Sequence, residues 1–349
     1  MPKKRTTLPK DFEELLSKKS LQELKDIFNQ CEVDAHGGYE KQTALAFDNC
    51  PHELAEWLIE QGADLQATDT WGNTPLHTRA RSTSGNIESL LKLGADINNK
   101  SNSTGTPLHA AADAHNVENT KLLLAHGAKA DELNADGYTP LEVALSTCNN
   151  IDIVETAEIS GIYLNAGVQT TSRMKDLVAK IGSTFEFHRA NFDQDTVAEV
   201  SEALEELYRL FNVVPVSKRI LHDGKSPIIT TAVTWQKQHQ DLWEQLVPSS
   251  GHAATIQGEV IRITGRIARE LEDNGGVNWD GEYKKMTDAL LAYLKQGKQL
   301  PSIELAEVED LVKEVKQKSG NTARLCELSV KWVTENTLPL TLSSISYKR

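Results

Sequence analysis

Closely spaced charged side chains near residue 260 could serve either ligand binding or catalysis. Glu259, Arg262 and Arg266 are three and four residues apart, so a helix would place them on one face, and Asp280 follows a Gly-Gly turn. Carboxylates set among arginines can hold a phosphate group or exchange a proton with a substrate. The same spacing is typical of ion pairs along a solvated or interdomain helix face, and we favour that interpretation.

Other signatures of catalysis or metal binding are absent from the sequence. Gly224-Lys225-Ser226 ends like a phosphate-binding loop, but Arg219 stands where its first glycine should be, and no strand is predicted before it. The four cysteines lack the C-x-x-C spacing of a zinc site and form no disulfide framework, which favours a reducing, cytoplasmic setting. We therefore expect no metal and no cofactor, and an enzyme is the less favoured class.

A short motif recurs in the first half of the chain as Thr-Pro-Leu-His or a close variant. In each copy the threonine can cap a short helix that begins at the proline, and a second apolar helix then ends at a glycine. The threonines are residues 43, 74, 106 and 139, and the glycines are residues 62, 94, 127 and 161. This period near 33 residues with T-P-L-H resembles the ankyrin-repeat family.

The resemblance implies a solenoid of helix pairs with projecting finger loops. Helical spacing of apolar residues predicts a mostly helical C-terminal domain after it, so we expect an all-α fold. We expect a disordered N-terminus at 1–9, then a capping repeat plus about four ankyrin repeats at 10–168. The C-terminal domain, 169–349, resembles no family that we recognise. Its first helix pair, near Ser172–Ile181 and Thr196–Phe211, is either a degenerate last repeat or the start of the new domain.

Helical spacing of apolar residues predicts the remaining elements of the C-terminal domain. The expected helices are Thr230–Leu246, Ala253–Leu271, Tyr283–Leu294, Ile303–Gln317 and Ala323–Trp332.

The negative charge of the chain is uneven. Residues 1–168 hold 14 Lys+Arg and 25 Asp+Glu, a net charge of −11 out of −13 for the whole chain. Such a field disfavours nucleic acid and favours a partner with a basic face, although solubility alone is the other interpretation. No apolar run is long enough to span a membrane.

Ankyrin arrays are binding scaffolds, so the resemblance implies a non-enzymatic protein that binds another protein. We expect the recognition face at the finger tips and the variable inner-helix positions. The histidines of the motif, His77 and His109, should bond neighbouring backbone groups rather than a metal. Arg79 replaces a small packing residue of the family, so its guanidinium should reach solvent or a partner. The candidate partner-binding residues are Trp71, Asn73, Arg79, Arg81, Ser103, Asp113, His115, Asp136 and Tyr138.

Three functional hypotheses follow. The first is an inhibitor or immunity-type protein whose acidic repeats cover a basic partner. The second makes the C-terminal domain an enzyme or ligand-binding domain, with a site lined by Glu259, Arg262, Arg266 and Asp280, and lets the ankyrin half recruit the target. The third is a scaffold that self-associates through its C-terminal helices.

Overall fold

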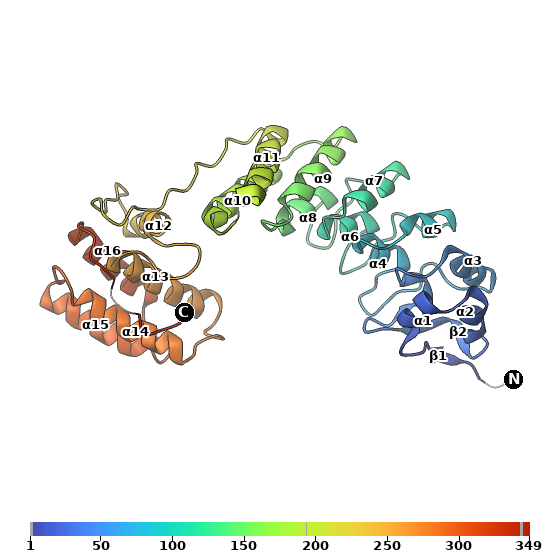
Figure 1. Cartoon of the computed structure of the whole chain (residues 1–349), viewed down its shortest axis with the longest axis horizontal. Coiled ribbons are helices and arrows are strands. Elements are labelled where there is room, and N and C mark those ends of the chain that lie inside the picture. Colours follow the sequence, from blue (N-terminus) through green and yellow to red (C-terminus); the bar gives the residue numbers. More distant parts are fainter. Residues whose placement is uncertain (1–2, 193, 343–344) are drawn as a thin grey trace. The chain divides into compact units, whose positions relative to one another are not determined.

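The computed structural model describes residues 3–192, 194–342 and 345–349 and is mostly helical. The chain divides into two compact units (Figure 1). Unit 1 comprises Met1–Phe185 and Gln194–Val216, and unit 2 comprises Glu186–Asp193 and Ser217–Arg349. No helix among the described residues combines the length and apolar character needed to cross a membrane.

Unit 1 begins with a small sheet that covers one end of the repeats. Its strands are β1 (Arg5–Thr7), β2 (Cys31–Gly37) and β3 (Gln42–Thr43), in the order β1-β2-β3. β1 runs parallel to β2, and β3 runs antiparallel to it. The expected disorder at 1–9 is therefore wrong for residues 5–7, because Arg5 N–H donates to Gln30 O at 2.8 Å. The Leu8 side chain is also buried.

Two short helices, α1 (Phe12–Lys18) and α2 (Leu21–Ile27), complete the N-terminal cap. Ser20 and Glu23 form a reciprocal capping box that starts α2. The Phe12 ring is buried against Phe28 and Phe47 in edge-to-face geometry, with centroids 6.2 and 5.4 Å apart. The cap therefore has an aromatic core that is shared with the first repeat.

The repeats alternate inner and outer helices (Figure 1). The inner elements are η1 (Ala44–Ala46), α4 (Pro75–Arg81), α6 (Pro107–Asp113) and α8 (Pro140–Thr147). The outer helices are α3 (His52–Glu60), α5 (Ile87–Lys92), α7 (Val117–Ala125) and α9 (Ile153–Asn165). Small buried residues such as Ala80, Ala111 and Ala144 let neighbouring inner helices pack closely.

The histidines of the repeated motif connect one repeat to the next, as expected. His109 Nδ1 accepts the Thr106 N–H at 3.0 Å, and its Nε2 donates to Tyr138 O at 3.0 Å. His77 Nε2 donates to Gly105 O at 2.9 Å in the same way. Because Nδ1 accepts and Nε2 donates, both rings are neutral, and burial lowers their pKa values.

The outer helices end in the same kind of turn. In the fourth repeat this turn lies at a different glycine from the one that the sequence analysis predicted. Gly62, Gly94, Gly127 and Gly167 all have positive φ, and each follows the last turn of an outer helix. The predicted glycine, Gly161, lies inside α9 instead. The helix continues past it because Tyr163 extends the buried face of α9.

A fifth helix pair, α10 (Ser172–His188) and α11 (Gln194–Phe211), extends unit 1 beyond the expected boundary at 168. α11 packs against α9 through its apolar face, which includes the buried residues Leu204, Leu207 and Phe211. This arrangement favours a degenerate last repeat over the start of a new domain. The last residues of α10 belong to unit 2.

Unit 2 is a helical globule built around α13 (Ile256–Ala268). The other helices are η2 (Arg189–Asn191), α12 (Trp235–Leu246), η3 (Arg269–Asp273, a π-helical turn), α14 (Gly281–Leu294), α15 (Ser302–Val315) and α16 (Thr322–Glu335). α13 packs against α12, α14 and α16. Its apolar stripe, including Ile256, Val260 and Ile263, is buried in the core.

Arg219 fixes the chain that leads into unit 2. Its Nε donates to Glu244 O at 2.9 Å and its Nη2 to Trp243 O at 3.0 Å, so it caps the last carbonyls of α12. The guanidinium also lies over the Phe187 ring, 4.2 Å from its centroid. One side chain therefore holds residues 186–188 and 217–219 against α12.

The buried neutral histidines predict that the protein loses stability in mild acid. Below pH ~6.5 the unfolded chain takes up protons at these imidazoles, whereas the folded chain, with lowered pKa values, does not. The free energy of unfolding should therefore fall as the pH drops from about 7 to 5.5, a range in which most carboxylates stay charged. The dependence should be shallower in His109→Gln and unchanged in His126→Gln, whose side chain is exposed. Thermal unfolding across this range measures it, and parallel curves for all three proteins would contradict the explanation.

Candidate functional site

The finger tips of unit 1 are rigid because a buried or half-buried polar side chain organises each turn. Asp69 Oδ1 accepts the N–H groups of Trp71 and Asn73, both at 2.8 Å. Asn134 Oδ1 accepts those of Asp136 and Tyr138 at 3.1 and 3.0 Å. Such Asx turns hold the tips in one conformation. We did not single out Asp69 and Asn134, although each stands five residues before the threonine of its motif.

Neighbouring fingers are hydrogen-bonded to one another. Ser103 Oγ donates to Trp71 O at 2.8 Å, and Thr104 Oγ1 donates to Asn73 Oδ1 at 2.8 Å. Thr70 N–H donates to Glu40 O at 3.0 Å, which joins the second finger to the turn between β2 and β3. The tips therefore form a continuous surface rather than independent loops.

Two large aromatic side chains stand exposed on this surface. Trp71 is 58% exposed, and Tyr39, in the turn between β2 and β3, is 97% exposed. Ser103 and Asp136 are also exposed, while Asn73 and Tyr138 are half-buried. Sequence reasoning missed Tyr39, for which the preceding Gly37-Gly38 turn was the available signal.

The inner helices contribute a charge pair. Arg81 on α4 and Asp113 on α6 form an ion pair of 3.1 Å, and both side chains remain partly exposed. These two candidates therefore lie together, and their charges cancel on the inner-helix surface.

Arg79, a candidate for partner binding, is instead fully buried, with 0% exposure. The chain that follows α4 covers it: Arg79 Nη1 donates to Asn86 O at 3.0 Å. A Cβ added to Gly85 would lie 2.3 Å from Arg79 O. Nε and Nη2 find no hydrogen-bond partner among the described residues. Burial lowers the pKa of Arg79, and the nearby Cys50 and Asp48 only partly offset this.

His115 is the second candidate that the structure removes from the recognition surface. It lies in the turn after α6 with a φ of +50°, and its ring is buried. Its Nε2 donates to Ala144 O on α8 at 2.9 Å. The ring therefore joins two repeats and cannot contact a partner.

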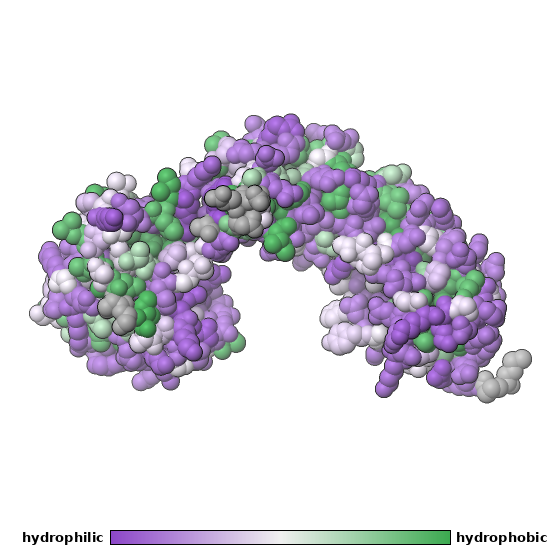
Figure 2. Space-filling view, viewed as in Figure 1, coloured by the Kyte–Doolittle hydropathy of each residue, from purple (hydrophilic) through white to green (hydrophobic). Residues whose placement is uncertain are grey.

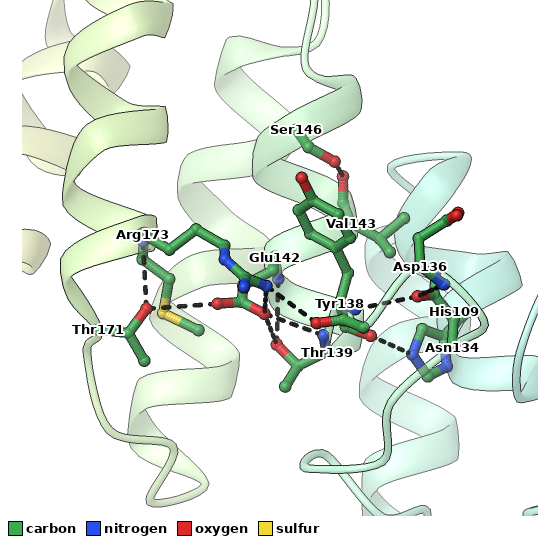
Figure 3. Close-up of polar contacts among 12 residues, drawn as sticks. His109, Asn134, Asp136, Tyr138, Thr139, Glu142, Val143, Ser146, Thr171 and Arg173 are labelled. Carbon is green, nitrogen blue, oxygen red and sulfur yellow. Dashed lines mark hydrogen bonds and ion pairs between the residues drawn. The ribbon is translucent and has the colours of Figure 1, made fainter.

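The last finger is held by a cluster around Glu142, which stands where the earlier motifs have histidine (Figure 3). Glu142 Oε2 accepts the Thr139 N–H at 3.1 Å and completes a capping box. Just before α10, Thr171 Oγ1 donates to Glu142 Oε1 at 3.3 Å. Arg173 Nη1 donates to Gly137 O at 2.9 Å, and its guanidinium lies 5.0 Å from the Tyr138 ring centroid. Sequence reasoning missed Arg173, which lies beyond the expected boundary.

Part of the acidic surplus of unit 1 lies on two of the outer helices. α3 and α9 have no lysine or arginine, and their glutamates are all exposed: Glu53, Glu56, Glu60, Glu155 and Glu158. The surface seen in Figure 2 is mostly hydrophilic, with scattered apolar residues.

The four residues that were considered for ligand binding or catalysis do not form an open acid–base site; they are Glu259, Arg262, Arg266 and Asp280. Glu259 and Arg262 pair inside unit 2, with Arg262 Nε 2.9 Å from Glu259 Oε2. Ala253 N–H and Tyr347 OH occupy the Glu259 carboxylate as well, at 2.9 and 2.5 Å. Burial raises the pKa of Glu259, but the bonds from Arg262 outweigh it and the pKa lies below its usual value.

The other two candidates, Arg266 and Asp280, are exposed. Asp280 caps α14 by accepting the N–H groups of Glu282 and Tyr283 at 3.0 and 3.1 Å. The ion pair that we favoured is present between Glu259 and Arg262, but it is buried rather than on a solvated or interdomain face. A catalytic role for the four residues stays a prediction. Within the described residues, no three His, Cys, Asp or Glu side chains are grouped as a metal site would require.

Comparison with known proteins identifies the class of the repeats. A family model of ankyrin repeats (3 copies) matches residues 43–129 and 80–158. Residues 43–158 are therefore ankyrin repeats, and such repeats imply protein binding.

The similar curated proteins share this region only. The chain is 36% identical over 107 residues to FPV031 of Fowlpox virus (strain NVSL), described as an ankyrin repeat protein, covering 30% of this chain and 31% of that protein. It is 33% identical over 116 residues to ZDHHC13 of Danio rerio, described as a palmitoyltransferase, and the match covers 32% of this chain and 18% of that protein. It is 42% identical over 92 residues to XBAT35 of Arabidopsis thaliana, described as an E3 ubiquitin-protein ligase, and the match covers 25% of this chain and 20% of that protein. The matches span less than a third of each relative.

The buried guanidinium of Arg79 predicts an unusual response to substitution. In Arg79→Met the unpartnered donors disappear and the apolar volume is retained, so we expect the free energy of unfolding to stay equal or rise. Arg79→Lys keeps a buried charge and should be less stable than the wild type. Denaturant unfolding of the three proteins measures the difference. A loss of more than about 2 kcal/mol in Arg79→Met would contradict this account.

The Glu142 cluster predicts a graded effect. Glu142→Ala removes the cap and the partner of Arg173, and should cost about 2 kcal/mol of unfolding free energy. Glu142→His should cost less, because a histidine here can accept from Thr139 as His109 does from Thr106. Chemical denaturation tests the order of the two variants, and a histidine variant no better than alanine would refute the structural equivalence.

Proposed function

We propose that the finger tips and exposed inner-helix positions of unit 1 bind a protein partner, with Trp71 and Tyr39 as anchors. The observation that carries this proposal is the exposure of a large aromatic side chain on a backbone that is already fixed. Trp71 N–H is bonded to Asp69, and Trp71 O accepts from Ser103. Aromatic side chains dominate binding hot spots, and a rigid loop loses little entropy when a partner binds.

The remaining exposed candidates would surround these anchors. Ser103, Asp136 and the half-buried Asn73 and Tyr138 offer hydrogen-bonding groups at the tips. The pair of Arg81 and Asp113 offers both charges on the inner helices. Arg79 and His115 have no part in this surface.

We propose a basic partner as the particular version of this function, with an inhibitor or immunity-type role as its sharpest form. The net charge of −11 over residues 1–168 supports it, from 14 Lys+Arg and 25 Asp+Glu. Because exposed glutamates gather on α3 and α9, their field would act mainly on the association rate rather than through contacts at the finger tips. Four free cysteines support a cytoplasmic setting for the complex.

The test uses the full chain as bait in a native lysate, followed by affinity measurement with each partner found. Trp71→Ala should weaken binding by about 30-fold, as truncation of a central aromatic anchor does. Tyr39→Ala should also weaken it. Ile151→Ala is the matched control, because Ile151 is exposed but lies in the turn between α8 and α9. A partner that binds all variants equally would place recognition elsewhere.

Salt dependence tests the charge of the partner separately. For a basic partner, the association rate should fall steeply as ionic strength rises, while the dissociation rate changes little. An association rate that is insensitive to salt would remove the basic-partner version and leave the binding surface intact.

A further inference from the structure

The last described residues, 345–349, lie against α13 and α14 in unit 2. They place Arg349 near Arg262 and Arg266, which belong to α13. Arg262 Nη2 donates to the main-chain oxygen of Arg349 at 2.8 Å. The Arg349 guanidinium is bonded to Asp280 at 2.8 Å and lies 5.0 Å from the Tyr283 ring centroid. The buried Tyr347 side chain holds this segment in place through Glu259.

Arg262 has one donor without an acceptor among the described residues. The residue is only 2% exposed, and its Nε and Nη2 are bonded to Glu259, His252 and Arg349. Its Nη1 is buried and has no hydrogen-bond partner within the described part of the chain. A buried charged donor without an acceptor is costly, so an acceptor that reaches this atom after a local rearrangement of the residues over it would be bound favourably.

Arg266 lies one helical turn further along the same face of α13. Its side chain forms no ion pair or hydrogen bond with the residues that the structure describes, although the residue is exposed enough to receive a ligand. Partial burial and the positive charges of Arg262 and Arg349 lower the pKa of Arg266. Glu259 and Tyr283 offset this only in part, and among the described residues no carboxylate pairs with Arg266 itself.

The Glu259 carboxylate already has its own partners. Its Oε1 is already bonded to Tyr347 and Arg262, at 2.5 Å each, and its Oε2 to Ala253 N–H and Arg262 Nε, at 2.9 Å each. Asp280 is likewise occupied by the cap of α14 and by Arg349. The acceptor that fits must come from outside these residues.

We infer that Arg262 and Arg266, with Arg349 beside them, form a binding site for a phosphate group or a similar oxyanion. An oxyanion oxygen would accept from Arg262 Nη1, and the Arg266 guanidinium would bind a second oxygen of the same group. Guanidinium groups match such oxygens in geometry and charge. This site belongs to unit 2, whereas the proposed protein-binding surface belongs to unit 1.

Calorimetric titration of the full chain with inorganic phosphate at constant ionic strength tests the site. Arg266→Gln should bind phosphate at least about tenfold more weakly, because it loses one charge-assisted interaction. Arg266 makes no intramolecular bond that the fold needs, so this variant should unfold at the wild-type temperature. Arg269→Gln, in the neighbouring exposed turn, is the matched control and should bind like the wild type.

Acetate serves as a second probe and separates a phosphate group from a carboxylate as the natural ligand. Binding of either anion that is lost in Arg266→Gln and kept in Arg269→Gln supports the site. No heat of binding for either anion with the wild-type chain would overturn it. Equal weakening in both variants would also overturn it, because that result describes a diffuse positive field.

Discussion

The repeats of unit 1 depend on one hydrogen bond, donated by a histidine ring to the carbonyl of the next finger. His77 Nε2 reaches Gly105 O at 2.9 Å, and His109 Nε2 reaches Tyr138 O at 3.0 Å. The other ring nitrogen accepts from the capping threonine, so a single neutral ring closes its own helix and fixes the neighbouring loop. One imidazole ring therefore joins an inner helix to the finger of the next repeat. In the fourth motif a carboxylate takes the same place, and it accepts from Thr171 just before α10 and pairs with Arg173 at the start of that helix.

The parts of the fold that sequence could predict are those specified by local residues. Thr-Pro caps and turn glycines determine the helix starts, the fingers and most helix ends, because their effects reach only one turn. The boundary at 168 and the assignment of Gly161 differ from the structure for a non-local reason. Whether α9 continues past Gly161 depends on Tyr163 finding a buried position, and whether α11 joins the repeats depends on the surface that α9 offers.

In the candidate site too, the sequence predicted what depends on nearby residues and failed where burial depends on distant ones. Position in the repeat placed Trp71, Ser103 and Asp136 correctly at exposed tips, because the turn geometry is set within a few residues. It failed for Arg79, which the chain up to Asn86 covers, and for His115, whose left-handed backbone directs the ring toward α8. In unit 2 the spacing of Glu259 and Arg262 predicted an ion pair, but its burial depends on Tyr347, which returns from the far end of the chain. No pattern near residue 259 could indicate that return.

The short segment Glu186–Asp193 belongs to unit 2, while the helix after it, α11, belongs to unit 1. This order has a consequence for synthesis on the ribosome, where the N-terminal part emerges first. The repeats can begin to fold early, but α9 stays uncovered until α11 has emerged. Residues 186–189 must then wait for Arg219 and α12, which are synthesised later. The two units are therefore expected to mature in an overlapping order. A chain interrupted between residues 212 and 234, after α11 and before α12, would carry a finished repeat array in which residues 186–189 still lack their partners in unit 2.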